Sequence, residues 1–334
     1  MKRILSFLIC AAALLALCAC SGDGSTKEER ETALTICGYD VPYEMLRYAA
    51  LNALKDKKDA GLTVPEGYIG TEEGKEMNRE LLDEALAALC ITYGAFGMAR
   101  DRGIDPFGDA IGELVEANLQ EKVAAYSSEE ELKSALAESG MNKSVLRTLL
   151  RYEAVYTEVF DDMKGKGDIA TDRAELEKIF AGEDFIAVKV LCFSTERHTI
   201  EECRSLAENA KAALAGGADF DEYVDGHGEM LEMFKNRDGL YVCRGIWRSE
   251  IEDAAFALGI GETSEPVESP DGVRILLRCE KTDEYLENNF DTLKDTYEEG
   301  VFRRAVEDAV DKATASVSLP EGFYDRSVFD MKVG

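Results

Sequence analysis

Apolar residues recur at helical spacing through the first half of the chain. Within 40–160 they return every three or four positions, and the clearest run, 78–99, has an apolar face made of Leu81, Leu82, Ala85, Leu86, Leu89 and Tyr93. This period is typical of amphipathic helices that bury one face. Glycine and proline interrupt the pattern at 61–70 and 103–106 and separate the helices. The pattern therefore predicts a helical region over residues 40–160.

The hydrophobic period changes after the glycine- and lysine-rich linker 163–168. Three later stretches are rich in β-branched and aromatic residues and predict strands: 185–193, 239–243 and 273–279. Two stretches between them have helical spacing and end at glycine: 200–215 and 251–258. This order predicts a small α/β module. The helical period returns at 285–315, so we expect the last helix to pack on the 34–160 region and the module to be an insertion.

The first twenty residues have the pattern of an export signal. Lys2 and Arg3 precede an apolar stretch, 4–17, that is shorter than the about 20 residues a membrane-spanning helix needs. The stretch ends in Leu-Cys-Ala-Cys, which resembles a bacterial lipobox with Cys20 as the lipidated residue. We therefore expect 1–19 to be a lipoprotein signal peptide and 20–33 to be a tether. The protein would then lie on the extracytoplasmic face of the bacterial cell membrane, and an ordinary signal peptide is the alternative.

The chain is strongly acidic, with a formal net charge of −29 at pH 7. This charge repels nucleic-acid phosphates and anionic lipid headgroups, so we expect no nucleic-acid partner and no headgroup binding. An acidic surface instead attracts basic segments, including those that unfolded polypeptides expose. The apolar content of 46% is enough for a packed core and excludes a disordered tail.

Cysteine and histidine give no sign of a metal site. Six cysteines follow Cys20 at wide, irregular spacings without a C-x-x-C motif, so buried thiols and disulfides both remain open: Cys37, Cys90, Cys192, Cys203, Cys243 and Cys279. The only histidines, His198 and His227, are not at ligand spacing from a cysteine. We expect no metal and no cofactor.

The segment 185–281 resembles the parvulin family of peptidyl-prolyl isomerases. Its most specific stretches, 252–258 (Glu-Asp-Ala-Ala-Phe-Ala-Leu) and 261–267 (Gly-Glu-Thr-Ser-Glu-Pro-Val), are similar to two consecutive family motifs. Residues 187–191 and 272–276 match the family's first and last strands less closely. The resemblance implies a four-stranded antiparallel sheet with flanking helices, and we place this parvulin-like domain at 170–283.

The flanks resemble the helical chaperone region of SurA-type and PrsA-type extracytoplasmic foldases. Those proteins begin with a short strand, here 34–38, followed by helices, here 81–163. Their C-terminal helix packs back on the N-terminal region, which implies that 284–334 joins 34–163. The expected fold class is therefore α+β: a helical chaperone domain formed by N- and C-terminal segments, with an inserted parvulin-like α/β domain.

The resemblance also implies an altered catalytic site. Parvulins use two central histidines, and these two positions are Lys189 and Arg274 here. Lysine and arginine only donate hydrogen bonds, whereas histidine can also accept one. The family's histidine network therefore cannot form in its usual way. We expect Lys189 and Arg274 to lie on neighbouring central strands. Two cations side by side there would repel each other, so we expect either an acid between them or at least one head group that reaches solvent.

Only part of the expected proline pocket matches the family pattern. Phe256 corresponds to the family's proline-contacting phenylalanine. The family's Gly-x-Met is Gly-Ile-Trp here, so Ile246 or Trp247 supplies the other wall. The family's acid or thiol aligns loosely with 225–230, where Glu229 is a candidate.

Two functions follow from this reading. One is a membrane-anchored foldase that retains proline isomerisation; the other is a non-catalytic holdase or scaffold lipoprotein whose parvulin domain has lost activity. Both imply unfolded or partly folded secreted polypeptides as partners, and a homodimer is left open. A solute-binding lipoprotein is disfavoured because its two α/β lobes do not fit a helical first half. A hydrolase is disfavoured because no G-x-S-x-G or H-E-x-x-H motif occurs.

Overall fold

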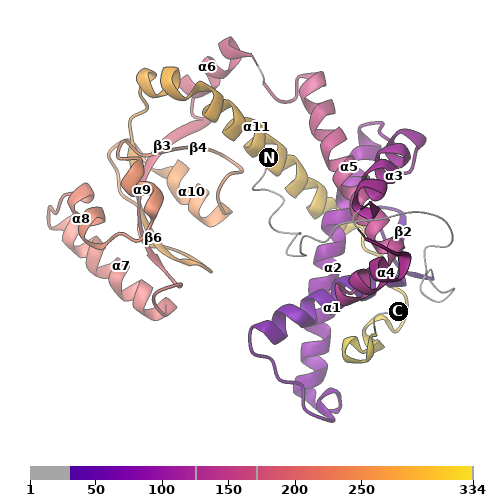
Figure 1. Cartoon of the computed structure of the whole chain (residues 1–334). Helices are drawn as coiled ribbons and strands as arrows, with labels where there is room; N and C mark the ends of the chain where they lie inside the picture. The colour runs from indigo at the N-terminus through magenta and orange to yellow at the C-terminus, as the bar shows by residue number, and fades with distance from the viewer. Residues whose placement is uncertain (1–30, 125, 171, 333–334) are drawn as a thin grey trace. The chain divides into compact units, whose positions relative to one another are not determined.

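The computed structural model describes residues 31–332 except 125 and 171 (Figure 1). The expected signal peptide, almost all of the expected tether and Cys20 lie outside the described residues. Contacts divide the described residues into two units: those up to 163 together with those from 305 onward, and those within 164–304.

The first unit is mainly helical. β1 (Thr32–Ile36) and β2 (Tyr39–Pro42) form an antiparallel hairpin. The described part of this segment then contains α1 (Tyr43–Asp59), α2 (Glu72–Asp101), α3 (Asp109–Val123), α4 (Glu129–Glu138) and α5 (Lys143–Lys166). The structure thus confirms the helical character that the hydrophobic period predicts.

α2 is the core helix of the first unit. Leu81, Leu82 and Leu89 on its apolar face are almost fully buried. By length and composition α2 is apolar enough to cross a membrane, but most of its apolar stretch is buried inside the fold. Its hydrophobicity is therefore explained by the core that it fills.

The C-terminal tail is bound to the first unit. Thr35 of β1 and Ser318 exchange two backbone hydrogen bonds of 3.1 and 2.9 Å. The Asn78 side chain of α2 donates to the Arg326 carbonyl (2.8 Å) and accepts from the Val328 amide (2.7 Å). Buried polar groups need such partners, so these bonds fix the tail against α2.

The second unit contains a four-stranded antiparallel sheet in the order β4-β3-β6-β5. Its strands are β3 (Phe185–Ser194), β4 (Leu240–Cys243), β5 (Val267–Ser269) and β6 (Gly272–Cys279). Its helices are α6 (Arg173–Ala181), α7 (Ile200–Ala215), α8 (Phe220–His227), α9 (Leu231–Lys235), α10 (Ser249–Ala257) and the first part of α11 (Asp283–Ala315). The expected fold class is confirmed, including the antiparallel sheet.

Two apolar clusters stabilise the second unit. The larger one joins the sheet to α7, α8 and α10. The smaller one joins Phe185 and Tyr241 of the sheet to α6 and to the first part of α11, where Leu286 and Leu293 are buried. The rings of Tyr241 and Tyr285 stack with centroids 3.6 Å apart.

This smaller cluster changes the expected role of the last helix. We expected all of 284–334 to pack on the N-terminal region, but residues of α11 up to Arg304 group with the sheet. The period of a helix shows which side chains share a face but not which surface that face covers. α11, which is kinked at Asn289, therefore supplies apolar residues to two cores.

Candidate functional site

Lys189 lies at the middle of β3, where the parvulin resemblance places the first histidine. Its Nζ is 2.6 Å from Oδ2 of Asp221 on α8, and its side chain is only 16% exposed. The Asp219 side chain accepts a hydrogen bond from the Glu222 amide and so caps the N-terminus of α8. This cap places Asp221 in the first turn of the helix. The ammonium group is thus neutralised by a local acid that the sequence reading did not identify.

Arg274 lies on β6, at the place of the second histidine, and is bound by the β5–β6 hairpin. Its guanidinium donates to Oγ of Ser269 (2.6 Å) and to Oδ2 of Asp271 (2.6 Å). The Arg274 guanidinium beside Asp271 lowers the pKa of that carboxyl from 3.8 to about 2. Arg274 is therefore a fixed cation whose hydrogen bonds are directed into its own hairpin.

Lys189 and Arg274 do not lie side by side. The two residues are on neighbouring central strands, but Lys189 is opposite Leu277 and Arg274 is opposite Cys192. Directly opposite residues share a face of an antiparallel sheet and successive residues alternate. An offset of three positions therefore places the two side chains on opposite faces. Each cation has its own acid, so no electrostatic repulsion between them has to be relieved.

The residues of the expected proline pocket are only partly brought together. Trp247 and Phe256 both pack, partly buried, against the larger apolar cluster. Ile246 packs against the smaller cluster instead. The guanidinium of Arg244 lies over the Phe256 ring, 4.3 Å from its centroid. Trp247 and Phe256 thus remain candidates for an apolar wall of the proline pocket, whereas Ile246 packs against the smaller apolar cluster.

The loop that carries Trp247 is held by buried contacts. Oε1 of Glu252, on α10, accepts the backbone N–H groups of Ile246 (2.7 Å) and Trp247 (2.8 Å), and Glu252 is only 7% exposed. On the other side, Nη1 of Arg303 donates to the Ile246 carbonyl (2.8 Å). The sequence analysis did not assign Glu252 this role of holding the loop. The signal for it is an acidic residue in the first turn of a helix that directly follows a Gly-x-x loop.

The same loop packs closely against α11. Gly245 has φ +90°, a conformation that favours glycine, and a Cβ there would lie 2.2 Å from the Gly300 carbonyl oxygen. A Cβ on Gly300 would in turn lie 2.5 Å from the Arg244 carbonyl oxygen. Both glycines are therefore required by the close approach of the two backbones.

Glu229 and His198 form a separate polar pair. Nε2 of His198 lies 2.8 Å from Oε1 of Glu229, and Oε2 of Glu229 accepts the Ser194 amide at 2.7 Å. Glu229 therefore ties the end of β3 to the segment after α8. The His198 side chain is partly buried at this contact.

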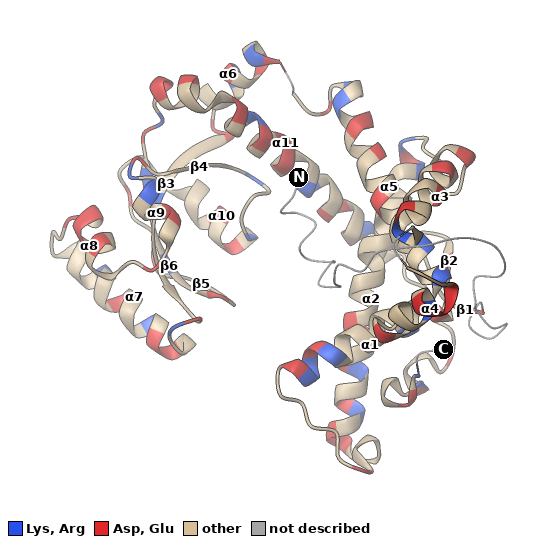
Figure 2. Ribbon diagram, viewed as in Figure 1, with Lys and Arg blue, Asp and Glu red and all other residues tan. Residues whose placement is uncertain are grey.

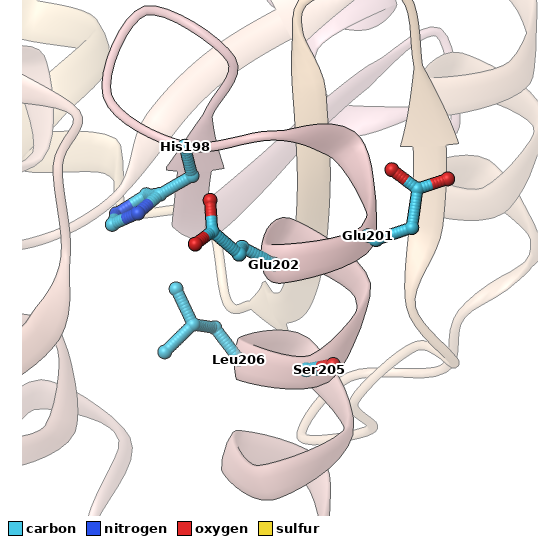
Figure 3. A pocket seen from close by; sticks show the side chains of 5 residues that line it. All are labelled: His198, Glu201, Glu202, Ser205 and Leu206. Atoms are coloured by element: carbon cyan, nitrogen blue, oxygen red, sulfur yellow. The ribbon is translucent and has the colours of Figure 1, made fainter.

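A shallow pocket lies beside this pair, at the first turns of α7 (Figure 3). It is lined by His198, Glu201, Glu202, Ser205 and Leu206. Glu202 belongs to a capping box with Thr199, and Glu201 pairs with Arg204 at 3.1 Å. The acids of this pocket are thus used in helix capping and a local ion pair, and the pocket contains none of the expected site residues.

The thiols near the sheet are poor nucleophiles. All six cysteines in the described part of the chain are free. Burial raises the pKa of Cys192, although Arg274 opposes the shift, and burial raises the pKa of Cys243 to about 12. Only the thiolate is reactive, so neither group supports nucleophilic chemistry. Within 31–332, apart from 125 and 171, no group of three or more His, Cys, Asp or Glu side chains has a metal-binding arrangement.

Comparison with known proteins agrees with this architecture. Residues 185–280 match the rotamase family described as the PPIC-type PPIASE domain. The chain is 23% identical over 285 residues to the foldase protein PrsA of Geobacillus kaustophilus, and this match covers 84% of the chain and 79% of that protein.

Solved structures of PrsA proteins and of a SurA-like chaperone are less similar to this chain in sequence. PrsA from Bacillus anthracis is 16% identical with a TM-score of 0.37, covering 68% of this chain and 97% of that one. A SurA-like chaperone structure from Campylobacter jejuni is 14% identical with a TM-score of 0.23, covering 85% and 98%. The family match and the PrsA similarity show that residues 185–280 are a PPIC-type peptidyl-prolyl isomerase domain within a PrsA-like chain.

Proposed function

We propose that the protein is a lipid-anchored extracytoplasmic folding factor that binds unfolded or partly folded secreted polypeptides. Three observations support this proposal: the lipobox-like sequence ending at Cys20, the similarity to a PrsA foldase, and a strongly acidic chain. Asp and Glu are spread over the helices of both units (Figure 2). Acidic surfaces attract basic client segments over a range set by the ionic strength.

We further propose that the PPIC-type domain binds X-Pro segments with weak or absent isomerisation. Rotation about the X-Pro bond faces a barrier of about 20 kcal/mol, which polar groups lower only when they are placed at the twisted amide. The observation that carries this proposal is that Lys189 and Arg274 are engaged by Asp221 and Asp271 on opposite faces of the sheet. Neither is free to act on a common amide, and neither can accept a proton.

An active isomerase is the second candidate. It is favoured by the close match at 252–258 and by the packing of Trp247 and Phe256 in one cluster. An apolar wall that desolvates the amide contributes to catalysis even without histidines.

Two assays on the mature chain distinguish these functions. Suppression of the aggregation of a reduced, unfolded secreted protein measures client binding, and NMR exchange on a short X-Pro peptide measures isomerisation. We expect suppression at stoichiometric amounts together with near-uncatalysed exchange. Absence of suppression would contradict the folding-factor proposal. A homodimer, which we also propose for testing, would appear in light scattering as twice the chain mass.

A further inference from the structure

Glu252 is a buried carboxylate to which the parvulin resemblance assigns no role here. A charged side chain that is 7% exposed is costly unless hydrogen bonds compensate the lost hydration. Its compensation comes from two neighbouring backbone N–H groups, those of Ile246 and Trp247, which share a single carboxylate oxygen. Hydrogen bonds to a charged acceptor are about twice as strong as neutral ones.

The contacts of this loop fix its position from two sides. Glu252 holds the two amides from α10, and Arg303 of α11 holds the carbonyl of Ile246. Gly245 and Gly300 allow the two backbones to meet without side chains between them. Three polar bonds and one steric contact therefore determine the conformation of a segment of three residues.

The held loop presents Trp247, the only tryptophan of the chain. Trp247 packs on the same apolar cluster as Phe256, which lies one turn of α10 beyond Glu252. Side chains at i and i+4 share a helix face. Glu252 thus links the backbone at Trp247 to the helix that carries Phe256.

We propose that Glu252 is a positioning residue that fixes Trp247 and thereby determines the affinity of the domain for X-Pro segments. This inference rests on the proposed function, because it assigns Trp247 to the wall that binds X-Pro segments. Glu252 does not itself touch the bound peptide.

The test uses the fluorescence of Trp247 in the mature chain. Acrylamide quenching measures how well the loop is held, and titration with the peptide Ala-Lys-Pro-Phe measures affinity, with Ala-Lys-Ala-Phe as the control for proline. Glu252→Ala removes both hydrogen bonds, and we expect roughly tenfold weaker binding together with more efficient quenching. Glu252→Gln keeps an acceptor oxygen, and we expect affinity within about threefold of wild type.

Glu250→Ala is the matched control, because Glu250 is exposed in the same first turn and its loss changes the charge equally. Wild-type quenching and affinity in Glu252→Ala, or an equal loss in Glu250→Ala, would overturn the proposal. If Glu252→Ala does not fold, Arg303→Ala removes one bond from the other side of the loop and must increase quenching. Wild-type protein that binds no proline peptide would refute the proposed function, while the quenching data would still decide the role of Glu252.

Discussion

The ion pair in the β5–β6 hairpin gives a prediction with a defined pH range. In Asp271→Asn, Arg274 loses its charged acceptor while its side chain stays only 13% exposed. A pKa of about 2 against an ordinary value of 3.8 corresponds to roughly 2.5 kcal/mol at 1.36 kcal/mol per pH unit. Since the Asp271 side chain is 56% exposed, solvent screening reduces this value, and we expect about 1 kcal/mol.

The pH dependence follows from the direction of the shift. A carboxyl whose pKa is lowered in the folded state stabilises that state above its unfolded pKa. The stabilisation by Asp271 is therefore fully present above about pH 4 and is lost as the pH falls toward about 2. The difference between wild type and Asp271→Asn should shrink over the same range.

Urea unfolding followed by Trp247 fluorescence measures this effect, because the only tryptophan lies in the second unit. Asp238→Asn is the control for the loss of one exposed carboxylate. Equal stability of Asp271→Asn and wild type at pH 7, or a difference that persists at pH 2, would refute the reasoning.

Three further predictions concern the loop, the unit boundary and the anchor. Gly245→Ala should lower the free energy of unfolding of the second unit by about 3 kcal/mol, because the added Cβ meets a backbone oxygen. Gly261→Ala is the control: this glycine also has a positive φ but open space around it, so the loss should be about 1 kcal/mol. Equal losses in urea unfolding would contradict this prediction. The fragment 164–304 should unfold cooperatively in calorimetry. It should melt at a higher temperature than the fragment 170–283, which lacks the first part of α11. Equal melting temperatures would show that the smaller apolar cluster does not stabilise the second unit. Cys20→Ala should release the protein from the membrane or leave an unprocessed precursor on immunoblots of cell fractions, and continued anchoring of a processed form would exclude Cys20 as the lipidated residue.

The sequence predicted where the helices and strands lie better than it predicted which surfaces their side chains cover. Helical period and β-branched runs located the helices and the central strands, because burial imposes these periods directly. The short β5 and α9 have too few residues to show a period. The two-core role of α11 was not predictable, because its apolar residues show no partner until the sheet is formed.

The site shows the same limit. The resemblance identified Lys189 and Arg274 as the positions of interest, but their relative placement depends on the register between β3 and β6. A change of one residue in register moves a side chain to the other face, and nothing local in either strand specifies it. Asp221 and Asp271 were missed because each acts through a contact that forms only after folding, whereas Glu252 had a local signal as an acid in the first turn of its helix.

The exchange rate of an X-Pro peptide in the presence of the mature chain tests the central claim most directly. Uncatalysed isomerisation takes tens to hundreds of seconds, so catalysis is readily measured by NMR exchange, with Phe256→Ala as the matched variant. We predict that wild type and Phe256→Ala both leave the exchange rate close to the uncatalysed value, while wild type still suppresses client aggregation. Rapid wild-type turnover that Phe256→Ala abolishes would contradict this account and show an active isomerase.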